Sequence, residues 1–237
     1  MTIDSYFPTL FRAPLKPDLP GTGFEVVLLP KPNEEFDNFE IRAASYPDLK
    51  RETGAEKIFR LSVFITDKQK LLFLAPAGPD ESESIKDLMF CVLEGLFILE
   101  KLEIVPEIGI ISGGREGDAG RNARVDQTLL DAKTLQSLLD KENISSQNYT
   151  ILIEDAVKKA NFLIIPDSLS GELILRTVAG IGEGREIGNI LLFKRPAQTK
   201  SLASKTIYIE QLTEKANPKD AEILKQALLS ANLGNND

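Results

Sequence analysis

A glycine- and arginine-rich segment between residues 107 and 124 has the composition of an anion-binding loop. It reads EIGIISGGREGDAGRNAR, in which a short apolar strand is predicted from Glu107 to Ser112. Glycine lets the backbone approach a ligand closely, and arginine forms charge-assisted hydrogen bonds with phosphate or carboxylate groups. The candidate ligand-binding residues of this segment and the next helix are Ser112, Gly113, Gly114, Arg115, Asp118, Arg121 and Asp126. A glycine-rich turn with surface arginines and no ligand remains the alternative.

A helix is predicted directly after this loop. Asp126 is a good N-cap candidate, and the run QTLLDAKTLQSLL that follows it places leucines on one helical face. The start of this helix would bring backbone N–H groups near Arg115, Arg121 and Arg124. Such a combination of N–H groups and positive charge favours an anionic ligand.

Two carboxylates are the candidate catalytic groups. YTILIED is predicted to be a strand that ends at Asp155, and NFLIIPD a strand that ends at Asp167, with a short helix DAVKKA between them. In open α/β sheets the carboxyl ends of the strands meet at one edge, where ligands bind. N-capping of the next helix is the alternative role for each carboxylate. The candidate ligand-binding residues Ser170, Gly171 and Arg176 follow, the last within a predicted helix ELILRTVAGIG.

The composition excludes several kinds of active site. The chain of 237 residues has no histidine and one cysteine, Cys91, so a Ser-His-Asp triad, a Cys-His pair, a histidine-ligated zinc site and an internal disulfide are impossible. No metal site is predicted and the cofactor is unknown. A net charge of −8 argues against a nucleic-acid partner. Because no apolar run is long enough to span a bilayer, we expect a cytoplasmic protein.

The chain is predicted to form a proline-rich arm over residues 1–22 and a single α/β domain over residues 23–237. Strands are expected at 23–30, 39–44, 189–193 and 206–210, a β-hairpin at 57–66 and 70–78, and a final helix at 218–233. Ser84 and Asp87 resemble a capping box that opens a helix from about Ile85 to Leu102. Its stretch from Leu88 to Leu99 carries one charged residue, Glu94, and includes Cys91 as a buried hydrophobe. This helix is expected to be buried nearly all round, in the core or at a homo-oligomer contact.

These segments resemble the methanogenesis marker protein 4 group, also called MtxX, whose members carry a methyltransferase label. The resemblance covers roughly Ile41 to Leu233 and rests on SGGR with Asp118, Gly120, Arg121, Val125 and Asp126, and on the EDAVK and PDxxSG patterns. The group is similar to the phosphate acetyl/butyryltransferase family. The resemblance implies an α/β fold of the phosphate acetyltransferase/isopropylmalate dehydrogenase type, with a mixed, mostly parallel sheet, flanking helices and a ligand cleft lined by the PDxxSG loop.

The resemblance implies a methanogenesis-associated transferase of a methyl or acyl group, with an anionic small molecule as its ligand. Arg115 and Arg121 would clamp the anion, and Asp155 or Asp167 would orient or deprotonate a nucleophile. Two departures from the pattern are a shorter N-terminal unit and Glu172, where the group tends to have asparagine. These departures favour the alternative, a non-enzymatic accessory subunit that binds methyl-transfer proteins. No GxGxG turn follows the first predicted strand, so an S-adenosylmethionine site is not supported.

Overall fold

The computed structural model describes residues 25–29, 47, 49–51, 53–66, 70–77, 84–101, 104–196 and 206–210. The chain divides into two compact units, Phe59–Glu186 and the combination of Met1–Ile58 with Ile187–Asp237. The predicted arm at 1–22, the strand at 39–44 and the helix at 218–233 lie outside the described residues. The expectation of a single domain over residues 23–237 remains a prediction.

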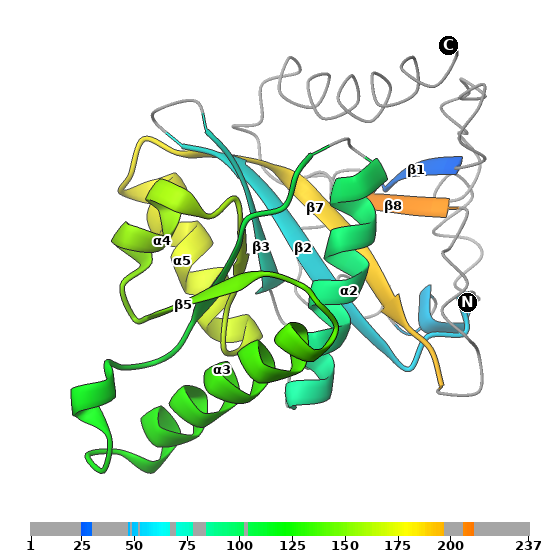
Figure 1. The fold of residues 1–237 in the computed structure, drawn as a ribbon. Helices are drawn as coiled ribbons and strands as arrows, with labels where there is room; N and C mark the ends of the chain where they lie inside the picture. Colours follow the sequence, from blue (N-terminus) through cyan, green and yellow to red (C-terminus); the bar gives the residue numbers. More distant parts are fainter. Residues whose placement is uncertain are drawn as a thin grey trace. The chain divides into compact units, whose positions relative to one another are not determined.

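The unit Phe59–Glu186 is built on a mostly parallel sheet, of which β2, β3 and β5 are labelled in Figure 1. Its strands in spatial order are β2 (Lys57–Ile65), β3 (Leu71–Ala77), β6 (Phe162–Ile164), β4 (Ile108–Ile111) and β5 (Ser146–Thr150). β2 and β3 form the predicted antiparallel hairpin. β3, β6, β4 and β5 pair in parallel, so their carboxyl ends share one edge of the sheet.

Helices cover both faces of this sheet. They are α2 (Ile85–Lys101), α3 (Ala123–Lys141), α4 (Ile153–Lys159) and α5 (Ser168–Gly180), with a short 3-10 helix, η3 (Glu116–Asp118). α2 and α3 pack against each other, and Gly95 of α2 lies against the ring of Phe162. The next strand residue, Leu163, packs instead with α4 and α5, because successive side chains of a strand point to opposite faces.

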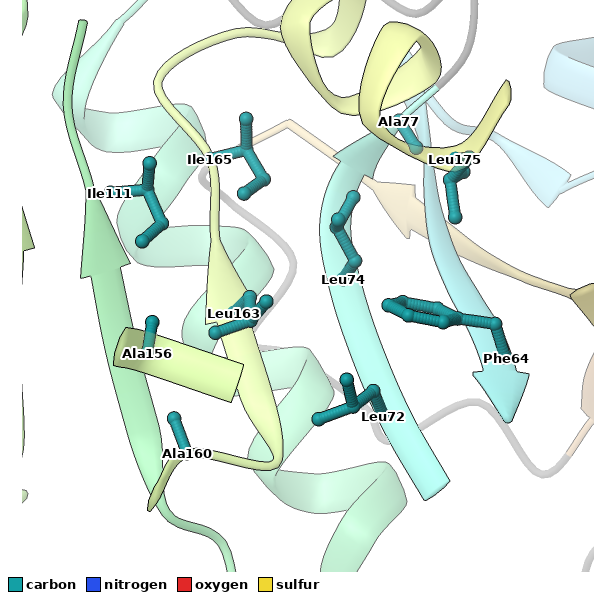
Figure 2. Packing of buried hydrophobic residues seen from close by; sticks show 10 residues of the cluster. All are labelled: Phe64, Leu72, Leu74, Ala77, Ile111, Ala156, Ala160, Leu163, Ile165 and Leu175. Carbon is teal, nitrogen blue, oxygen red and sulfur yellow. The ribbon is translucent and has the colours of Figure 1, made fainter. Parts of the chain in front are cut away.

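The core on the α4 and α5 side joins neighbouring strands to both helices. Figure 2 shows Leu74, Leu163 and Ile111 from β3, β6 and β4 within one cluster that also contains Ala156 of α4 and Leu175 of α5. All five side chains are buried, and burying a leucine or isoleucine contributes about 1.5–3 kcal/mol. This packing fixes the strand ends from which the candidate loops depart.

α2 begins as predicted but is not buried all round. Ser84 Oγ donates to Asp87 Oδ2 at 2.9 Å and accepts the Asp87 N–H at 3.3 Å, which confirms the side-chain cap. Cys91 is buried, as expected, whereas Leu93 is 45% exposed, which corrects the expectation of burial on every side. Among the helices within the described residues, none has the length and apolar character needed to cross a membrane.

The second unit contains three of the described strands. β1 (Glu25–Leu29) pairs in parallel with β8 (Thr206–Glu210), and β8 pairs antiparallel with β7 (Arg185–Lys194). The strands predicted at 23–30, 189–193 and 206–210 are therefore confirmed, although β7 is longer than predicted. A small core cluster contains Leu49, Ala55, Ile58 and Leu191.

The prediction that YTILIED forms a strand was wrong. β5 ends at Thr150, and α4 begins at Ile153, so Asp155 lies in the first turn of a helix and does not follow a strand. Ile153, Ala156, Val157 and Ala160 recur at helical spacing and pack on the core cluster, which explains why this apolar run is helical. β5 is an edge strand and is only partly buried, so it lacks a strong apolar pattern of its own.

Candidate anion-binding site

The chain leaves β4 through a turn that is fixed by Ser112. This side chain is buried and its Oγ donates to the carbonyl oxygen of Gly114 at 3.1 Å. The Ser112 N–H donates to the carbonyl oxygen of Thr150 at 2.8 Å. Thr150 has φ of 56°, a left-handed conformation that β-branched residues rarely adopt. Ser112 therefore holds the turn against the end of β5.

The two glycines of this turn pack against the first turns of α3. The Gly113 N–H donates to Thr128 Oγ1 at 2.8 Å, so it is satisfied within the protein. A Cβ at Gly114 would collide with the side chain of Val125. This close approach of loop and helix explains why position 114 requires glycine.

Two aspartates organise the rest of the loop. Asp118 accepts the Arg115 N–H with Oδ2 at 2.9 Å and binds Arg121 Nη1 with Oδ1 at 2.7 Å. Asp126 Oδ1 accepts the Gly120 N–H at 2.8 Å. Both carboxylates therefore stabilise the loop that carries the arginines.

α3 begins earlier than predicted, and its N-cap is Asn122 rather than Asp126. Asn122 has extended backbone angles, φ −152° and ψ 123°, and its Oδ1 accepts the N–H groups of Arg124 at 2.9 Å and Val125 at 3.4 Å. The prediction of Asp126 as N-cap was wrong because that residue lies inside the first turn and binds the loop. Asparagine is an equally good N-cap, so the signal was present in the sequence.

The three arginines of the segment differ in their partners. Arg121 is paired with Asp118, and Arg124 Nη2 lies 3.3 Å from Asp167 Oδ2. Arg115 is exposed, and within the described part of the chain its guanidinium forms no ion pair and no hydrogen bond. Arg115 is thus the arginine of this loop that is available to an anion.

Asp167 connects this loop to the start of α5. It follows β6, caps α5 by accepting the Ser170 N–H with Oδ1 at 2.8 Å, and binds Arg124 with its other oxygen. The capping alternative is therefore confirmed for Asp167. α5 begins at Ser168, earlier than predicted, because this cap precedes it. Gly171 packs directly on the Pro76 carbonyl of β3, where a Cβ would overlap the backbone.

Two predicted site residues are not brought into this cluster. Asp155 is exposed on α4, and Lys158 Nζ binds its Oδ1 at 2.6 Å. This hydrogen bond from Lys158 is the main cause that lowers the pKa of Asp155. Arg176 Nε binds Glu172 Oε1 at 2.7 Å one turn away on α5. Among the contacts of the described residues, neither Asp155 nor Arg176 reaches the arginine loop.

Arg124 is the residue that the sequence interpretation left out of the candidate set. It was recognised as a nearby charge, but its partner lies 43 residues away in sequence. Only the parallel pairing of β4 with β6 brings the two segments to the same edge. No local spacing rule could have identified this contact.

Comparison with known proteins agrees with the predicted resemblance. No family model matches the chain. The chain is 37% identical over 181 residues to a Methanosarcina mazei protein named "Putative methyltransferase mtx subunit X", which covers 71% of this chain and 65% of that protein. This chain is similar to proteins of that name. Proteins of the same name from Methanosarcina acetivorans and Methanosarcina barkeri are 40% and 42% identical, and the matches cover 50% and 53% of their lengths. The chain thus spans about half to two thirds of these relatives.

Solved structures show the fold. A branched-chain phosphotransacylase from Enterococcus faecalis has a TM-score of 0.57 at 11% identity and covers 87% of this chain and 73% of its own. EutD phosphotransacetylase from Staphylococcus aureus has a TM-score of 0.51 at 14% identity, and the match covers 76% of this chain and 55% of that protein. A 4-hydroxythreonine-4-phosphate dehydrogenase from Klebsiella pneumoniae has a TM-score of 0.52 at 11% identity, and the match covers 87% of this chain and 64% of that protein. The predicted fold class is therefore confirmed.

Proposed function

We propose that the chain is a group transferase that acts on an anionic metabolite or cofactor in the cytoplasm. One observation carries this proposal: the loops after two neighbouring parallel strands are joined by Arg124 and Asp167, and the first of them carries Arg115, which has no ion-pair partner among the described residues. The carboxyl edge of a parallel sheet is where α/β proteins bind ligands. The methyltransferase name of the relatives and the phosphotransacylase names of the structural neighbours support group transfer.

In this proposal Arg115 is the main anion clamp. A guanidinium without a competing carboxylate can donate two parallel N–H···O bonds to a phosphate or carboxylate group. Arg121 contributes less, because Asp118 already neutralises it. During transfer, Arg115 would stabilise the negative charge that develops on the leaving group as its bond to the transferred group breaks.

Neither candidate carboxylate is suited to proton transfer. A general base works best with a pKa near the working pH. The lowered pKa of Asp155 moves that group away from this range. Both oxygens of Asp167 are engaged, one by the Ser170 N–H and the other by Arg124. Asp167 would therefore position Arg124 and the start of α5.

The second candidate function is a non-enzymatic accessory subunit that binds methyl-transfer proteins. The relatives are named as a subunit, which favours assembly with other chains. α5 and the residue after it also expose apolar side chains: Leu169 is 61%, Leu173 60% and Ile181 86% exposed. Exposed apolar groups gathered on one helix are typical of a protein contact.

Calorimetric titration separates the two functions. Acetyl phosphate, coenzyme A, coenzyme M and S-adenosylmethionine are titrated separately into the intact protein, and each compound that binds is then incubated with the other three to detect a transferred group. The transferase proposal predicts that at least one compound binds below millimolar concentration and takes part in transfer. If all four fail to bind at millimolar concentration, the transferase proposal is abandoned in favour of the accessory subunit.

A further inference from the structure

The ion pair between Arg124 and Asp167 has the properties of a contact that can be exchanged. Arg124 Nη2 and Asp167 Oδ2 are 3.3 Å apart, and the two side chains are 73% and 23% exposed. The arginine is open to water although the aspartate is largely covered, and the contact is longer than the roughly 2.7–2.9 Å of a strong charge-assisted hydrogen bond. Such a pair contributes little to stability, because solvent screens the guanidinium and its long side chain must be held in place. Arg124 can therefore leave Asp167 at small cost.

Asp167 keeps its structural role when Arg124 leaves. Its Oδ1 caps α5 by accepting the Ser170 N–H at 2.8 Å, and only Oδ2 binds Arg124. The pair of Asp118 and Arg121 differs, because it is shorter, at 2.7 Å, and local to one loop. Arg124 is thus the paired arginine whose release disturbs neither a loop nor a helix cap.

The residues next to Arg115 and Arg124 in sequence lie against each other in space. Gly114 precedes Arg115, Val125 follows Arg124, and a Cβ at position 114 would meet the Val125 side chain. Arg115 alone supplies one positive charge, whereas a phosphate group bears up to two negative charges. A second guanidinium next to the first would complete the charge balance for such a group.

We propose that Arg124 is a second anion-binding residue, which Asp167 holds in the ligand-free protein and gives up to a phosphate-bearing ligand. This inference rests on the proposed anion site at Arg115. Asp167 then acts as an internal competitor of the ligand, because its carboxylate occupies Arg124 and repels the incoming anion. The exchange favours dianionic phosphate groups over singly charged carboxylates.

Titration with inorganic pyrophosphate tests the exchange, because the proposal predicts that removing the Asp167 charge tightens binding. Asp167→Asn should tighten pyrophosphate binding by about two- to fivefold, the range that an exposed ion pair supports. Arg124→Ala should weaken binding by about fivefold, and the double variant should bind like Arg124→Ala. Asparagine is an equally good N-cap, so the melting temperature of Asp167→Asn should be unchanged. Asp140→Asn, which removes one negative charge near the far end of α3, is the matched control and should change affinity less than twofold.

Each other outcome overturns the exchange. If Asp167→Asn binds pyrophosphate as well as or more weakly than the unaltered protein, Asp167 does not compete with the ligand for Arg124. If the double variant binds more tightly than Arg124→Ala, the effect of Asp167→Asn is a general effect of charge. If the unaltered protein binds pyrophosphate and Arg115→Ala weakens that binding, the proposed site stands even when Asp167→Asn has no effect. If neither the unaltered protein nor Asp167→Asn binds pyrophosphate at millimolar concentration, the anion site and the exchange both fail.

Discussion

Arg115 differs from the other arginines of its loop by having no carboxylate partner among the residues described. We expect Arg115→Ala to weaken anion binding by about tenfold to a hundredfold, which corresponds to the roughly 1.5–3 kcal/mol of a charge-assisted hydrogen bond. Lys141→Ala removes the same charge at the far end of α3 and is the control. Calorimetric titration measures the affinities, and thermal melting checks that both variants remain folded. Equal affinities of the two variants would remove Arg115 from the site.

Asp155 is expected to titrate as a structural carboxylate. The hydrogen bond from Lys158 is the main cause of its lowered pKa, so Lys158→Met should raise the pKa of Asp155 toward its ordinary value. The pKa of Asp155 is lower in the folded protein than in the unfolded chain. The stability that the Lys158 contact contributes is therefore fully present above the ordinary pKa of an aspartate, and it is lost as the pH falls through the folded-state pKa. Carbon-13 NMR of the carboxyl group follows this titration. An unchanged pKa in the variant would show that another group causes the shift.

At the residue scale, the sequence predicts local chemistry better than contacts between segments. The N-cap role of Asp167 was one of two stated alternatives and is confirmed. The anion-binding role that the types and order of Ser112, Gly114 and Arg115 indicate stays a prediction. The partner of Arg124 could not be predicted, because it depends on the register of β4 and β6.

α3 depends on its cap at Asn122. Its side chain satisfies two N–H groups of the first turn. Asn122→Ala should therefore lower the free energy of unfolding by about 1 kcal/mol, whereas Asn122→Asp should be nearly neutral. Chemical denaturation measures both. Equal losses for the two substitutions would mean that the side-chain oxygen does not act as the cap.

α5 depends on glycine where it crosses β3. Gly171→Ala would place a methyl group against the Pro76 carbonyl, so we expect a loss of about 1–3 kcal/mol in the free energy of unfolding. Gly117→Ala is the matched control, because a Cβ there meets nothing within 4 Å. Its change should remain within about 0.5 kcal/mol. Similar stabilities of the two variants would contradict the close packing of α5 on β3.

At the element scale, the sequence predicted most helices and strands but misplaced β5. Apolar residues at every second position of Lys57–Ile65 predicted β2, although the strand is buried on both faces. The apolar run around Ile153 is compatible with both a strand and a helix. The helix is favoured because it packs the apolar side chains of this run on the core cluster. Edge pairing with β4 then places β5 on the more polar residues before it.

At the scale of the whole molecule, the predicted self-association has two candidate faces. α2 exposes Leu93 at 45%, and α5 exposes Leu173 at 60%. We expect light scattering to give a mass above that of one chain at micromolar concentration, because exposed apolar groups favour association. Leu173→Glu and Leu93→Glu compare the two faces, and the variant that lowers the mass identifies the contact. The mass of a single chain throughout the micromolar range would exclude self-association.

An anion is expected to bind where the loops after β4 and β6 meet. A crystal structure of the intact protein grown with pyrophosphate, or with whichever compound binds in calorimetry, tests it most directly. We expect density for the anion within hydrogen-bonding distance of the Arg115 guanidinium, with Arg124 turned from Asp167 toward the ligand. Density for the anion elsewhere on the chain, with Arg115 still unpaired, would contradict it.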